Sequence, residues 1–261
     1  MNKLLNIIRA DIYKLIKSKV LIWDFLGLIA ILLIGNLLTI NGEGLMTLIS
    51  DTQNLNQVNY SIKGSAIMPE LLKGSNILVL FLIPIVINVF ISDFRYATIK
   101  NNISHQYTRA SVYIAKLLIC SLFAIIVPIF YVLMGLILNM IFNGSISNVF
   151  LVDFINTFKI ILNQIPLYIG FESAMILIGV LFQSNLATAM FTILYQIIII
   201  FITSIVTSIN ISEYDPITCL DKVAYINDLN LSQISGFWMI GITLMIVSMC
   251  LGIYLFNKKD F

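Results

Sequence analysis

The sequence predicts an all-α polytopic membrane protein, with six transmembrane helices preceded by an amphipathic interfacial helix and both termini in the cytoplasm. Of its 261 residues, 59% are apolar and only 11% are charged, whereas soluble domains carry about 25% charged residues. The apolar residues fall into long runs, and the basic residues gather in alternate connections between them. This composition excludes a soluble domain, and a net charge of +2 is too small to indicate nucleic-acid binding.

Six apolar runs are long enough, or nearly so, to cross a hydrocarbon core of about 30 Å as helices. They form one transmembrane domain over residues 1–261, with spans at about 20–40, 76–92, 112–142, 164–182, 187–209 and 236–256. The third run would reach about 46 Å as one helix. We expect its leading end, which holds Lys116, to project from the bilayer.

The positions of lysine and arginine predict the orientation. With a cytoplasmic amino terminus, eleven basic residues lie in the inner segments and four in the outer ones, and eight acidic residues lie outside. Both ends of the chain are therefore expected inside.

Residues 1–19 carry apolar side chains at helical spacing, from Leu4 to Ile16, with basic residues largely opposite them. This pattern predicts a helix in the inner headgroup layer. Two interpretations are equally open: an elbow helix that braces the first span, and a basic anchor that only fixes orientation.

The longest inner connection, residues 93–109, is the place for a cytoplasmic partner. Its apolar residues Phe94, Ile99, Ile103 and Tyr107 lie four or five apart, so a short helix would present an apolar edge bordered by positive charge. The alternative is an ordinary basic loop that holds the topology.

The same connection resembles the segment after the second span of ABC-2 type permeases, the membrane subunits of ATP-binding-cassette exporters. The matching positions are Phe94, Ala97, Thr98, Ile99, Lys100, Asn101, Ser104, Thr108, Arg109, Tyr113 and Lys116. The family often has glycine where Ala97 stands. Residues 4–15 also resemble the family's amino-terminal helix, although the specific motif covers only about one tenth of the chain.

The resemblance implies a permease that pairs with a second permease chain, as a homodimer or a heterodimer, and binds a separate ATPase. The ATPase-docking residues would be Phe94, Arg95, Thr98, Ile99, Lys100, Asn101, Ser104 and Arg109. No glycine is followed by lysine, so the chain lacks a phosphate loop. We therefore expect no enzyme activity and no cofactor in this chain, with ATP and Mg²⁺ bound by the partner.

By analogy, the substrate would be an amphipathic peptide, toxin or drug-like molecule, exported across the cytoplasmic membrane of a bacterium. The sequence leaves open the substrate and whether the protein serves export or self-immunity. Two alternative functions also remain open. The protein could be a proton-coupled secondary transporter that uses Glu172, or a membrane assembly protein that transports nothing.

Polar residues inside the runs are candidates for a translocation path. Thr188, Thr192, Gln196 and Thr203 share one face of the fifth run, so protein or water should cover them. The alternative is that the threonine hydroxyls bond to their own helix.

Glu172 is the one carboxylate deep in a run, where it would contact a cationic substrate or accept a hydrogen bond from Ser173, Gln196 or another hydroxyl. Asp24 is expected to snorkel towards Lys17 or Lys19. Residues 210–235 form either a short helix that caps the outer exit or a solvated connection. No cluster of metal ligands or catalytic side chains is evident in the sequence.

Overall fold

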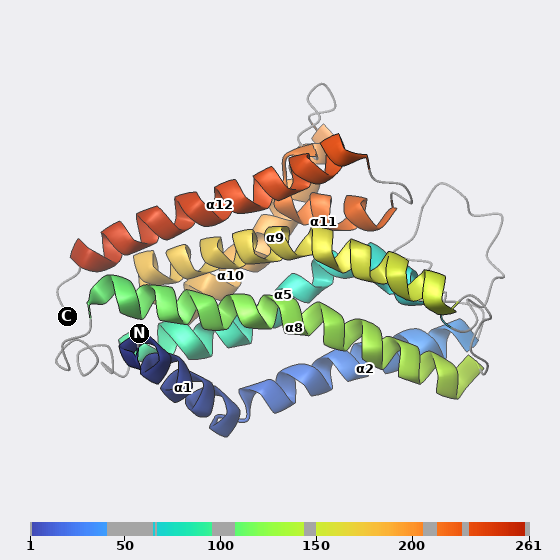
Figure 1. Cartoon of the computed structure of the whole chain (residues 1–261), viewed down its shortest axis with the longest axis horizontal. Helices are drawn as coiled ribbons and strands as arrows, with labels where there is room; N and C mark the ends of the chain where they lie inside the picture. Colours follow the sequence, from blue (N-terminus) through green and yellow to red (C-terminus); the bar gives the residue numbers. More distant parts are fainter. Residues whose placement is uncertain are drawn as a thin grey trace.

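The computed structural model describes residues 2–40, 65, 67–95, 108–143, 150–205, 213–225 and 230–258, and every regular element in these residues is helical. Figure 1 shows an elongated bundle in which α1, the start of α8 and the end of α12 share one end. The elements are α1 (Asn2–Lys17), α2 (Val20–Ile40), α4 (Ile67–Leu71), η2 (Leu72–Ile77), α5 (Leu78–Val86), η3 (Ile87–Ile91), α6 (Ser92–Arg95), α8 (Arg109–Asn143), α9 (Phe150–Phe182), α10 (Asn185–Ile205), α11 (Pro216–Tyr225) and α12 (Leu231–Lys258).

Four helical stretches of the described chain are long and apolar enough to cross a membrane: Ile67–Ile91, Arg109–Phe142, Phe150–Phe182 and Leu231–Lys258. A fifth candidate is the bent pair of α1 and α2, whose axes differ by 59°. The chain is thus a multi-pass helical membrane protein with four or five candidate spans. The fifth predicted span, residues 187–209, corresponds to α10, which over Asn185–Ile199 is a shorter apolar helix.

Two predicted spans begin earlier than the hydropathy pattern indicated. The second starts at Ile67 instead of residue 76, and the fourth starts at Phe150 instead of residue 164. Polar side chains lower the hydropathy of the first turns of α9, but the structure gives them partners. The Ser65 hydroxyl donates to Asp153 Oδ2 at 2.5 Å, and the Thr157 hydroxyl donates to the Asp153 carbonyl at 2.7 Å.

The stretch Ile67–Ile91 is irregular along its length. Gly74, inside η2, has φ −113° and ψ 30°, which interrupts the helix. Pro84 lies inside α5 and supplies no N–H to the helix, and the wider π-helical turn η3 follows it directly. The backbone hydrogen bonding of this segment therefore departs from the α-helical pattern both before and after α5.

Helix α9 lies at the centre of the bundle and packs closely against α12. A Cβ atom on Gly170 would lie 2.5 Å from the Gly241 carbonyl oxygen, and a Cβ on Gly241 would overlap the backbone of Pro166. The two helix backbones touch because both contact positions lack a side chain, as is common for helix pairs in membranes.

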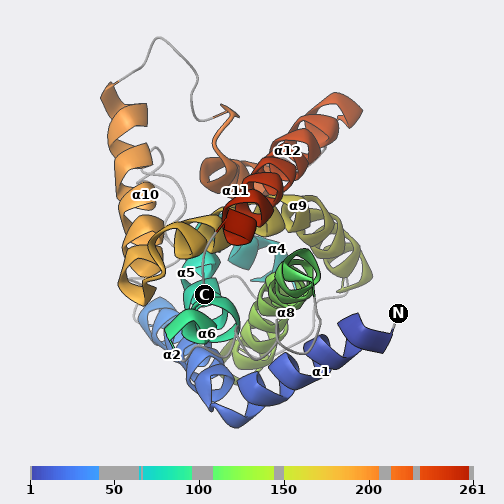
Figure 2. The same cartoon turned by 90° about the vertical axis from the view of Figure 1, so that its left-hand side faces the viewer.

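The amino-terminal helix packs mainly against α8, whereas the first of the two interpretations expected it to brace the first span. Ile7, Asp11 and Leu15, at successive turns of α1, are buried, while Tyr13 and Ile16 are exposed. Figure 2 shows α1 lying along the outside of the bundle beside α8. The chain turns at Lys19, where φ is +59°.

Lys116, in the leading turns of α8, is fully buried within the protein; that this end of the helix projects from the bilayer stays a prediction. One expectation about a charged residue is wrong. Asp24 does not snorkel: it is 6% exposed, and its Oδ2 atom has no hydrogen-bond partner among the described residues. Asp24 shares its helix face with Leu28 and Leu32, which are buried. This face of α2 is turned towards the bundle, away from water.

Candidate functional site

Lys116 is the centre of an ion-pair cluster that joins three helices. Its Nζ donates to Asp11 Oδ2 of α1 at 3.0 Å, to the Val89 carbonyl of η3 at 2.7 Å, and to Asp93 Oδ2 of α6. The side chain of Asp93 is 4% exposed and that of Asp11 is 10% exposed. With these three acceptors, each of the three N–H groups of the buried lysine makes a hydrogen bond. The cluster therefore fixes α1 and α6 against α8.

Lys14 extends this cluster to the surface. Its Nζ donates to Asp93 Oδ1 at 2.5 Å and to the Ser92 hydroxyl at 2.8 Å. Burial raises the pKa of the Asp93 carboxyl, but Lys116 and Lys14 outweigh burial and hold this pKa below its usual value. Asp93 therefore remains a carboxylate.

The cluster lies at one end of the predicted docking segment, and a second attachment lies at the other end. Arg109, the first residue of α8, donates from Nη1 to the Asn257 carbonyl at 2.7 Å. Carbonyls in the last turn of a helix lack partners within the helix, so the end of α12 accepts this cation readily. Residues 96–107 are thus bounded by two fixed points, one on α1 and one on α12.

The structure describes only part of the predicted docking set. Phe94 and Arg95 belong to α6, and their side chains are not described. Thr98, Ile99, Lys100, Asn101 and Ser104 lie outside the described residues. Arg109 is described, and it contacts the end of α12.

The predicted polar face of α10 is turned towards protein along the part that is described. Thr188 and Thr192 are fully buried, whereas Ile193 and Ile197 on other faces are 43% and 45% exposed. The hydroxyls of Thr188 and Thr192 donate to the carbonyls of Ser184 and Thr188, at 3.3 and 3.1 Å. The face therefore points inward, and the hydroxyls bond to their own helix as the alternative expected.

Farther along this face, Gln196 Nε2 donates to the Asn76 carbonyl at 3.3 Å, so the amide joins α10 to η2. The side chain of Thr203 lies outside the described residues.

Glu172 is 1% exposed, and its Oε1 atom has no hydrogen-bond partner among the described residues. The two partners proposed from sequence are engaged elsewhere. The Ser173 hydroxyl donates to the Gly170 carbonyl at 2.6 Å, and the Gln196 amide donates to Asn76.

Of the two alternatives for residues 210–235, the structure has the short helix, α11; that it caps an outer exit stays a prediction. Asp215 begins it as an N-cap, because its Oδ2 accepts from the Thr218 N–H at 2.7 Å and Pro216 follows it. The Tyr195 hydroxyl of α10 donates to Asp215 Oδ1 at 2.6 Å. On its other side α11 is bound by Gln164 of α9, whose Nε2 donates to the Leu220 carbonyl at 2.8 Å.

The attachment of α11 includes a carboxyl that titrates near neutral pH. Asp221 Oδ1 accepts from the Asn76 N–H at 3.3 Å. Burial raises the pKa of Asp221 to about 7, and the hydrogen bond from Asn76 lowers it only in part. The folded protein therefore binds a proton here between about pH 4 and pH 7 that the unfolded chain has released.

From this shift we expect the stability of the protein to fall as the pH rises from about 4 to about 7. The contribution of Asp221 to the free energy of unfolding is fully present below about pH 4 and lost above about pH 7; it amounts to about 2 kcal/mol, less than the full shift would give, because the carboxyl keeps some contact with water. Asp221→Asn should flatten the pH dependence of the thermal unfolding midpoint between pH 4 and pH 7. Glu213→Gln, at an exposed position, is the matched control. Parallel curves for Asp221→Asn and the wild type would contradict the assignment.

Sequence reasoning missed Asp11, Lys14 and Asp93 as a site. The signal lay in their positions: Asp11 interrupts the apolar stripe of Ile7 and Leu15, and Lys116 interrupts an apolar run. Charges on the apolar faces of two helices must find each other or stay unpaired in the interior.

No model of a protein family matches the sequence, and no curated protein is significantly similar to it. The fold and the apolar helices define the class, a multi-pass helical membrane protein.

Proposed function

We propose that this chain is the permease subunit of an ATP-driven exporter of the ABC-2 type, with six spans and both termini in the cytoplasm. A separate ATPase binds the segment from Asp93 to Arg109 and supplies the energy. The proposal rests on the motif in that segment and on the resemblance of the amino-terminal helix to the same family.

The observation that carries the proposal is the fixed attachment of this segment at both ends. Before it, Asp93 is held by Lys116 and Lys14; after it, Arg109 is held by the end of α12. A force applied to residues 96–107 by a partner would pass directly to α1, α8 and α12. A loop that only satisfied the orientation rule would not need ion pairs buried from water.

In this proposal a second permease chain, identical or related, completes the transporter. The substrate is an amphipathic peptide, toxin or drug-like molecule, and the path includes Glu172 and the α10 face of Thr188, Thr192, Gln196 and Thr203. Thr188 and Thr192 are covered by the chain itself, so the path opens only when α10 moves away from α9.

Purification of the tagged chain from membranes of its own host tests the proposal. We expect an ATPase with a phosphate loop to co-purify in equal number and to hydrolyse ATP. The double variant Phe94→Asp/Ile99→Asp should lose this ATPase, because two carboxylates on the apolar edge would remain unpaired in the interface.

Tyr214→Asp is the matched control, since Tyr214 is an aromatic residue, 73% exposed, beside α11. This variant should keep the ATPase. Unfolding midpoints show whether each variant is folded. A folded double variant that keeps the ATPase at unchanged stoichiometry would refute the docking assignment.

A further inference from the structure

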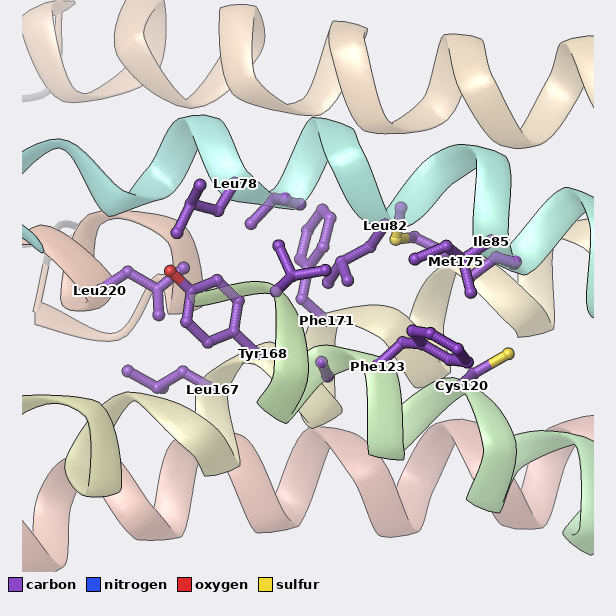
Figure 3. Close-up of a cluster of buried hydrophobic side chains, with 14 of the residues drawn as sticks. Leu78, Leu82, Ile85, Cys120, Phe123, Leu167, Tyr168, Phe171, Met175 and Leu220 are labelled. Atoms are coloured by element: carbon purple, nitrogen blue, oxygen red, sulfur yellow. The ribbon is translucent and has the colours of Figure 1, made fainter. Parts of the chain in front are cut away.

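A line of polar side chains runs through the interior of the bundle along α9 and α8. On α9, Gln164, Tyr168 and Glu172 follow one another at intervals of four residues, which keeps them within about 80° of one helix face. All three are at most 1% exposed. Tyr168 lies within the apolar cluster of the core, as does Cys120 of α8 (Figure 3). Polar groups at this depth are costly, so their alignment calls for a physical reason.

One half of the line leads from Glu172 to α11. The Tyr168 hydroxyl donates to the Ser75 carbonyl at 2.9 Å, and Gln164 Nε2 donates to the Ser75 hydroxyl at 2.8 Å. The next residue of η2, Asn76, donates from its N–H to Asp221. Side chains of α9, together with the backbone carbonyl of Ser75 and the backbone N–H of Asn76, therefore join the centre of α9 to a partly exposed carboxyl on α11.

The other half leads from Glu172 to the opposite end of the bundle. Cys120 of α8 lies in the same buried cluster as Phe171 and Met175, the neighbours of Glu172 on α9 (Figure 3). Lys116, one turn from Cys120 on α8, binds Asp11 and Asp93, and Asp93 binds Lys14. The Lys14 side chain is 36% exposed and reaches the surface.

Glu172 stands where the two halves meet. The part of the chain that is described offers no hydrogen bond to Oε1. An ionised carboxylate without a partner in such a place costs several kcal/mol, so the neutral acid is the favoured form. We propose that Glu172 is an internal proton-binding site that exchanges its proton with water.

The exchange involves one bond and no redox partner. The Oε–H bond of Glu172 breaks, a water molecule accepts the proton to become hydronium, and the electron pair of the broken bond stays on the carboxylate. Uptake is the reverse. The proposal concerns this chain alone and does not rest on the proposed ATP-driven export.

A proton fits this site better than a metal ion or an organic cation. No third histidine, cysteine or carboxylate joins Glu172 and Cys120 among the residues described, so a metal would lack ligands. Phe171 and Met175 next to Glu172 are at most 2% exposed, which leaves a larger cation no open approach.

The elements packed against α9 carry several titratable groups. Helix α8 brings Tyr113, Lys116, Cys120 and Tyr131, all buried, and α11 brings buried Cys219; α5 and η3 bring none. Elsewhere these groups either have other partners or lie exposed: Glu70 pairs with Lys73, Tyr195 with Asp215 and Asp221 with Asn76, and Cys250 and Tyr254 of α12 are exposed.

Infrared difference spectroscopy of the purified chain in lipid bilayers, without an ATPase, tests the proposal. The wild type minus Glu172→Gln spectrum at neutral pH should contain the carbonyl stretch of a protonated carboxyl. This band should shift in D₂O, because the proton exchanges with solvent.

Glu70→Gln is the matched control, because Glu70 is ion-paired with Lys73 at 2.6 Å and should contribute no such band. If Glu172→Gln does not fold, Glu172→Asp keeps a carboxyl and should retain the band at a displaced frequency. Absence of the band from the wild type, or a band that never shifts in D₂O, would overturn the proposal. So would loss of the band on adding sodium or a hydrophobic organic cation at constant pH, because Glu172 would then bind that cation.

Discussion

Replacing Lys116 by methionine should destabilise the protein by about 3–5 kcal/mol, the cost of removing one partner from a buried ion pair. Methionine fills nearly the same volume as lysine, so the loss of stability measures the effect of removing the charge and its hydrogen bonds. Asp11 would lose the lysine it accepts from, while Asp93 would keep Lys14. The thermal unfolding midpoint of the purified chain in detergent, followed by tryptophan fluorescence, measures this loss.

Lys14→Met is the control for this variant, because Lys14 also binds Asp93 but is partly exposed. An exposed ion pair contributes up to about 1 kcal/mol. Adding Asp11→Asn and Asp93→Asn to Lys116→Met should recover part of the stability, since no unpaired charge then remains in the interior. A Lys116→Met variant no less stable than Lys14→Met would show that the cluster contributes nothing from its burial.

The second large effect is expected at the contact between α9 and α12. Gly241→Ala should destabilise the protein by about 1–3 kcal/mol, and more if the helices cannot separate. The added methyl group would overlap the carbonyl of Pro166 and lie 2.7 Å from Leu167 N. Backbone atoms cannot move aside as a side chain can, so the two helices must shift apart.

Gly236→Ala is the matched control on the same helix. A Cβ on Gly236 meets nothing within 4 Å. This variant should therefore gain up to about 1 kcal/mol from the better helix propensity of alanine. Equal unfolding midpoints for the two variants would mean that the close approach of α9 and α12 is not required for stability.

The hydropathy pattern predicted the helices better than it predicted their ends. The bounds of α2 agree with the predicted span over residues 20–40, because that run is apolar on average, despite Asp24 and Asn36, and is flanked by polar residues. The start of α9 was placed 14 residues too late, since Asp153 and Lys159 make its first turns polar on average. The helix continues there because its backbone hydrogen bonds are local and its polar side chains find partners.

The candidate site was less accessible to sequence reasoning. The motif around Phe94 and Arg109 is a local pattern and could be recognised along the chain. The partners of Lys116 come from positions 105 and 23 residues away, and no spacing rule relates such distances.

By itself, the sequence determined that this is a helical membrane protein, where most of its long apolar helices lie, and that α1 is amphipathic. Each of these follows from periodicity and composition, which are local properties of the chain. Only the tertiary structure decided that Lys116 is buried with Asp11 and Asp93, that Asp24 faces the bundle, and that Gln164, Tyr168 and Glu172 line up with Cys120. A charged or polar residue in an apolar run can face lipid, water or protein, and which of these it meets depends on the packing of helices distant in sequence.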